Sequence, residues 1–115
     1  MFTLIRGGKV YSPAETGSRD ILIAASKIVK IGDRIDLPRN FDAEVVEAVG
    51  KIVTPGFIDL HVHIIGGGGE GGPSTRVPEI QLGQITRAGV TTVLGVLGTD
   101  DVSRHPESLL AKALG

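Results

Sequence analysis

Residues 52 to 64 form an almost continuously apolar run, which Asp59, His61 and His63 interrupt. Such a run is typical of a strand that is buried on both faces, as strands are in parallel sheets covered by helices. Imidazole and carboxylate groups are costly to bury without partners. We therefore expect the chain to build an α/β sheet around this segment and to give its three polar side chains a specific environment.

The sequence after this run alternates between helix and strand patterns. Pro78 precedes an expected helix at 79–88, and Gly89 suits the position just after the end of that helix. Residues 90–97 predict a second strand, and Pro106 is typical of the first turn of another helix. The order strand, helix, strand, helix indicates a parallel α/β sheet.

The first half of the chain predicts short strands that are separated by turns. The apolar-rich stretches lie at 2–6, 21–24, 28–31 and 44–48. The pair Gly7-Gly8 and residues 12–17 are typical of turns. We expect a small β-sandwich domain at 1–53 and a second domain at 54–115.

Composition narrows the classes of partner and of metal site. The chain has 12 basic and 13 acidic residues, a formal net charge of −1, and no basic run that could neutralise phosphates. It also lacks an apolar stretch of the roughly 18 residues typical of a membrane span. We expect a cytoplasmic protein that binds neither nucleic acid nor membrane. Because the chain has no cysteine, a metal here would be held by histidines and carboxylates.

His61 and His63 are two positions apart on the expected strand, so their imidazoles should project from one face, with Asp59 a further step back. This spacing suits two ligands of one metal ion. The structural alternative is a core histidine beside a solvated one. The pair precedes the glycine-rich tract 66–72, at the strand end where α/β barrels build active sites, which favours the metal. Asp59 either orients a histidine or is an ordinary solvated or capping carboxylate.

Residues 55 to 63, Pro-Gly-Phe-Ile-Asp-Leu-His-Val-His, resemble the first-strand signature of the amidohydrolase superfamily. The four glycines and Glu70 at 66–70, and the Ser-Arg-His-Pro segment at 103–106, are similar to those of isoaspartyl dipeptidases. The resemblance implies an α/β fold in which a small β-sandwich, the composite amidohydrolase domain, leads into a (β/α)8 TIM barrel. A complete barrel needs about 250 residues, so only its first two βα units would lie here.

The resemblance also implies a binuclear zinc site, in which His61 and His63 bind the more buried ion. Zinc would activate water near neutral pH and polarise the amide carbonyl. The remaining ligands, a carboxylated lysine and two further histidines, and the proton-handling aspartate would lie beyond Gly115. Lys112 belongs to an expected helix and is not that lysine. We therefore expect no catalytic residue within this segment, and no activity from the segment alone.

The substrate that the resemblance implies is an isoaspartyl dipeptide, with Gly68, Glu70 and Thr99 lining its pocket. Glu70 would pair with the free α-ammonium group, although a loop carboxylate without such a role is the structural alternative. The complete enzyme is expected to form a homo-oligomer. Two other functions stay open, which are an amidohydrolase acting on cyclic amides or N-acetyl sugars, and a non-catalytic binding or assembly module.

Two competing motifs are weaker. The glycines at 67, 69 and 72 satisfy the dinucleotide-binding pattern, but a tract with six glycines does so by chance, and Glu70 would repel a pyrophosphate. Arg104 and His105 resemble a catalytic dyad. Their place at the start of an expected helix favours a structural role in capping and packing.

Overall fold

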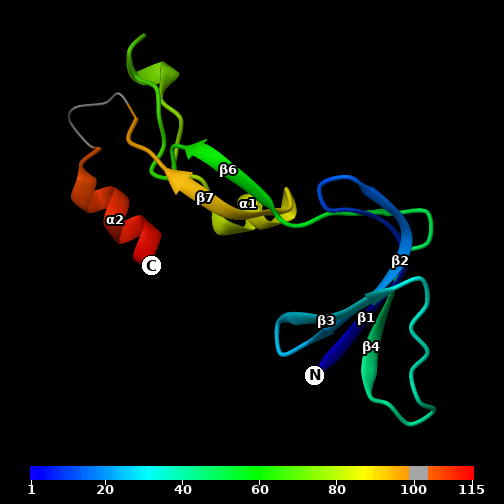
Figure 1. Ribbon diagram of the computed structural model, residues 1–115. Coiled ribbons are helices and arrows are strands. Elements are labelled where there is room, and N and C mark those ends of the chain that lie inside the picture. The colour runs from blue at the N-terminus through cyan, green and yellow to red at the C-terminus, as the bar shows by residue number, and fades with distance from the viewer. Residues whose placement is uncertain (99–103) are drawn as a thin grey trace. The chain divides into compact units, whose positions relative to one another are not determined.

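The structure is a computed structural model of the chain and describes residues 1–98 and 104–115. It divides into two compact units, Met1–Pro55 and Gly56–Gly115. The first unit is built from strands, and the second alternates strands and helices (Figure 1). The α/β class predicted from the sequence is confirmed. No helix in the described ranges is long and apolar enough to cross a membrane.

The first unit is one mixed five-stranded sheet. Its central strand β1 pairs antiparallel with β2, and β3 continues the sheet beyond β2. On its other edge β1 pairs in parallel, first with β4 and then with β5. The strands span β1 Phe2–Tyr11, β2 Glu15–Ala24, β3 Lys27–Gly32, β4 Ala43–Glu47 and β5 Ile52–Val53. All four strands expected in this half of the chain are present.

The turn expected at Gly7-Gly8 is wrong, because both glycines lie inside β1. The pairing with β2 shifts register between Ile5 and Gly8, which is a β-bulge. Gly7 adopts a φ of 67°, and a Cβ on Gly8 would stand 2.5 Å from a methyl group of Val53. The glycines therefore admit a bulge and close packing without reversing the chain. Of the turn expected at 12–17, only 12–14 lie outside strands.

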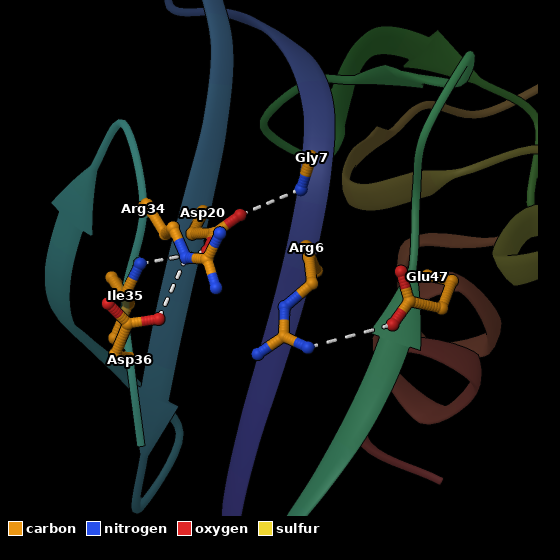
Figure 2. A network of polar contacts seen from close by, with 7 residues as sticks. All are labelled: Arg6, Gly7, Asp20, Arg34, Ile35, Asp36 and Glu47. Atoms are coloured by element: carbon orange, nitrogen blue, oxygen red, sulfur yellow. Dashed lines mark hydrogen bonds and ion pairs between the residues drawn. The ribbon is translucent and has the colours of Figure 1, made fainter.

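A buried carboxylate holds this bulge in place. Asp20, only 3% exposed, accepts hydrogen bonds from the main-chain N–H groups of Gly7, at 2.8 Å, and of Ile35, at 2.9 Å (Figure 2). One oxygen, Oδ1, binds the bulge in β1, and the other, Oδ2, binds the segment that follows β3. The pairs Arg6–Glu47 and Arg34–Asp36, drawn in the same view, have exposed or part-exposed side chains. The apolar core beside Asp20 contains Leu4, Val10, Ile21, Ile35 and Ala48.

The second unit contains the two expected βα units. Strands β6 Phe57–Val62 and β7 Val90–Gly95 pair in parallel, and the helices are η1 Pro73–Thr75, α1 Leu82–Arg87 and α2 Pro106–Leu114. Helix α1 begins three residues later than predicted, because Gln81 and Gln84 form a capping box at its start. Gly89, with a φ of 76°, follows its end, and Pro106 starts α2, both as predicted.

The expected burial of residues 52–64 on both faces is wrong for the chain as described. The run divides into β5 and β6, and three apolar residues of β6 stay exposed, Phe57 by 55%, Ile58 by 65% and Leu60 by 70%. Two strands with short helices leave much of their surface uncovered. The pattern predicted the strand correctly, but burial on both faces needs neighbours that the described residues do not supply.

Replacing Asp20 by Ala should destabilise the first unit by about 2–6 kcal/mol, because it leaves two main-chain donors unpaired at about 1–3 kcal/mol each. The denaturant midpoint of the native protein measures the loss. Asp36→Ala, which removes an exposed carboxylate next to Arg34, is the matched control and should change the midpoint little. Equal losses in the two variants would show that Asp20 is an ordinary surface charge.

Candidate functional site

Two imidazoles converge at the carboxyl end of β6. His61 is in the strand and His63 follows it directly. Their Nε2 atoms are 3.3 Å apart, and the rings lie edge to face with centroids 5.0 Å apart and planes at 78°. The alternation of side chains along an extended chain brings both rings to one side, as the spacing predicted.

The separation of the two nitrogens fits a shared metal ion. Ligands at about 2.0–2.1 Å from a tetrahedral zinc lie about 3.3–3.4 Å apart, which is the separation seen here. A direct hydrogen bond between the rings would be long, because N–H donors usually lie about 2.7–3.2 Å from their acceptors. The separation of the two nitrogens is therefore compatible with ligation of one tetrahedral metal ion by both rings.

The surroundings of the pair supply no complete coordination sphere. No group of three or more histidines and carboxylates in the described ranges could hold a metal ion. The Nδ1 atom of His63 is buried and has no hydrogen-bond partner among the described residues. Metal-ligating histidines usually donate this second nitrogen to an acceptor. Further ligands and that acceptor would have to come from outside the described residues.

Asp59 acts on the main chain near the pair. Its Oδ1 accepts a hydrogen bond from the N–H group of His61, at 3.1 Å. This contact fixes the strand at the first histidine. The role of Asp59 in orienting an imidazole ring stays a prediction.

The glycine-rich segment after β6 folds back on itself. Gly67 and Val77 exchange two main-chain hydrogen bonds, of 3.2 and 2.8 Å, and the turn η1 lies between them. Gly66 has a φ of 85°, and a Cβ there would stand 2.2 Å from the carbonyl oxygen of Val77. Gly68 has a φ of 70°, and its Cβ would stand 2.5 Å from the carbonyl oxygen of Thr75. Glycine is therefore required at both positions by the close approach of main chain to main chain.

This loop, residues 66–77, begins against the second imidazole. The N–H group of Gly66 donates to the carbonyl of His63, at 2.8 Å, and a Cβ on Gly67 would stand 3.4 Å from the ring. Glu70 is exposed in the loop. Thr99, the third residue expected to bind substrate, lies outside the described residues. A three-residue turn, and not a long helix, follows the glycines, which counts against the dinucleotide-binding alternative.

Arg104 was expected to play a structural role, but its partners could not be foreseen from the sequence. The side chain is buried, at 7% exposure. It donates hydrogen bonds to main-chain carbonyls of the 66–77 loop and of Ile65, the residue that precedes the loop. The acceptors are Ile65 at 3.4 Å, Gly67 at 3.1 Å, Gly68 at 3.1 Å and Val77 at 3.4 Å. Its neighbour His105 is the N-cap residue of α2, but the imidazole makes no capping hydrogen bond.

Comparison with known proteins gives one consistent group of relatives. No protein-family model matches the chain. The structure of β-aspartyl dipeptidase from Fervidobacterium islandicum AW-1, in complex with β-Asp-Leu dipeptide, has a TM-score of 0.84 and 43% identity, and the match covers 99% of this chain and 30% of that one. The structure of dihydropyrimidinase from Brevibacillus agri NCHU1002 has a TM-score of 0.66 and 28% identity, and the match covers 98% of this chain and 23% of that one.

Sequence comparison finds a dihydroorotase from Macrococcus caseolyticus (strain JCSC5402), which is 37% identical over 111 residues. The match covers 96% of this chain and 25% of that protein, so the chain spans about a quarter of the length of such curated relatives. These relatives are hydrolases of the amidohydrolase superfamily. The resemblance to isoaspartyl, or β-aspartyl, dipeptidases that the sequence indicates is confirmed.

Proposed function

We propose that this chain, as a segment of an amidohydrolase-superfamily hydrolase, forms the start of a zinc-dependent enzyme that cleaves the β-aspartyl bond of dipeptides. The observation that carries the proposal is the 43% identity, over 99% of the chain, to a β-aspartyl dipeptidase whose structure contains β-Asp-Leu. The proposal includes a small β domain at 1–53, a barrel that begins at 54–115, and a cytoplasmic homo-oligomer.

Under this proposal His61 and His63 supply two ligands of a binuclear zinc site. The 3.3 Å between their Nε2 atoms supports ligation of one ion by both rings. When bound, zinc supplies a Lewis acid that polarises a carbonyl group and activates water near neutral pH. The rings hold the ion at the carboxyl end of β6, and Asp59 fixes the main chain that carries them.

The loop after β6 would provide the substrate contacts. A β-aspartyl residue is linked through its side-chain carboxyl, so its α-ammonium and α-carboxylate groups stay free and charged. The exposed carboxylate of Glu70 suits the ammonium group. Gly68 lets the main chain come close to the substrate, and the hydroxyl of Thr99 is the third contact in the proposal.

A second candidate is a hydrolase that acts on cyclic amides. The dihydroorotase and dihydropyrimidinase relatives favour it, because each matches nearly the whole chain. The structural similarity to dihydropyrimidinase is lower, with a TM-score of 0.66 against 0.84 for the dipeptidase. We therefore rank the dipeptidase first.

The metal assignment is tested with the three histidines of the chain. His61→Asn and His63→Asn should each lower the zinc content of the full-length native protein, as measured by plasma mass spectrometry after dialysis. Loss of a residue that hydrogen-bonds to a metal ligand typically costs about 10–100-fold in metal affinity, and loss of the ligand itself should cost at least as much. His105→Asn is the matched control, because that imidazole makes no capping bond and Asn is a good N-cap. Unchanged zinc in the first two variants would remove these residues from the site.

The substrate assignment is tested by rates of hydrolysis in the same full-length protein. β-Asp-Leu should be cleaved and α-Asp-Leu should not, while dihydroorotate tests the second candidate. Glu70→Gln should lower kcat/KM for β-Asp-Leu about 10- to 100-fold, because it removes a charged hydrogen bond of about 1.5–3 kcal/mol. Glu107→Gln, an exposed carboxylate in the first turn of α2, is the control. Equal rates for the two dipeptides, or a Glu70→Gln variant with the wild-type kcat/KM for β-Asp-Leu, would contradict the assignment.

A further inference from the structure

Arg104 lies far along the chain from the loop that it contacts. The acceptors of its guanidinium group are 27 to 39 residues earlier in the sequence. Gly67 and Gly68 are on the outgoing arm of the folded loop, Val77 is on its returning arm, and Ile65 comes just before the loop. The buried side chain of Arg104 therefore connects the two arms of the loop by hydrogen bonds.

We propose that Arg104 is a positioning residue, which fixes the shape of the 66–77 loop and through it the place of Glu70. The effect on substrate rests on the proposed function, whereas the effect on the loop does not. Arg104 would touch neither substrate nor metal ion. It would act on the loop through main-chain carbonyls.

The chemistry of the contacts favours arginine over other residues. A planar guanidinium group carries five N–H donors in a fixed fork, so it can serve several carbonyls at once. Lysine offers three donors from one point and cannot span both arms equally well. Buried carbonyls without donors cost free energy, and a buried cation without acceptors costs more. In this structure Arg104 supplies donors to the loop carbonyls, and the carbonyls supply acceptors to the buried guanidinium group.

The packing around Gly98 adds a second observation. A Cβ on Gly98 would stand 2.9 Å from the carbonyl oxygen of Gly66 and 3.0 Å from both Cα of Gly67 and Cδ of Arg104. The chain that follows β7 thus lies directly against the start of the loop that follows β6.

The test uses Arg104→Met and Arg104→Lys in the full-length native protein. Amide hydrogen exchange at Gly66, Gly67 and Val77 should be about tenfold faster in Arg104→Met, since a buried hydrogen bond typically contributes about that factor. Arg104→Lys should be intermediate. KM for β-Asp-Leu should rise about tenfold in Arg104→Met, while kcat changes less than about threefold and the zinc content stays the same. Arg87→Met is the control, because that exposed guanidinium donates to the carbonyl of Gly83 within α1.

Amide hydrogen exchange in the 66–77 loop at the wild-type rate in both variants would overturn the proposal. Faster exchange spread evenly through residues 56–98, or a fall in kcat as large as the rise in KM, would also overturn it, because Arg104 would then support general folding. If Arg104→Met does not fold, Arg104→Lys carries the test. Amide hydrogen exchange in the loop and a KM between the wild-type values and those expected for Arg104→Met would support the proposal, and wild-type values would overturn it. If the wild-type protein does not cleave β-Asp-Leu, the proposed function fails, and the exchange measurement still tests the loop by itself.

Discussion

The parallel pairing of β6 with β7 is the constraint on which the candidate site depends. Phe57 pairs with Val90 at one end and Val62 with Gly95 at the other, so the two strands run in the same direction and end at the same edge. The imidazole pair lies at this edge, and so do the chain segments that follow both strands. Arg104, which follows β7, can reach the carbonyls of the loop after β6 only because of this arrangement. An antiparallel partner would place that arginine at the opposite end of the sheet.

The two parts of the site have different consequences for specificity under the proposed function. A pair of imidazoles 3.3 Å apart suits a metal ion, and it carries no information about the substrate. This agrees with the presence of both a dipeptidase and a dihydroorotase among the relatives of the chain. Selection of a charged dipeptide would instead depend on the loop, where tightly packed glycines set the main chain and Glu70 supplies a negative charge. A loop of this kind needs an internal support, and Arg104 has the contacts to provide it.

Local sequence patterns predicted the local structure well. The two-residue spacing of His61 and His63 was sufficient to predict that their rings converge, and Gly89 and Pro106 mark helix boundaries correctly. Features that depend on distant partners were missed. Gly7-Gly8 resembles a turn, because nothing near it shows that Asp20 bonds to the bulge from the next strand. The acceptors of Arg104 lie at least 27 residues away, and the burial of β6 depends on neighbours and not on its own composition.

Anomalous X-ray diffraction at the zinc absorption edge, from crystals of the full-length native protein, tests the metal assignment most directly. We predict a peak about 2.0–2.1 Å from the Nε2 atoms of both His61 and His63, with the two nitrogens still about 3.3–3.4 Å apart. A zinc peak bound elsewhere, or two imidazoles that bond to each other with no peak between them, would contradict the assignment of this pair as metal ligands.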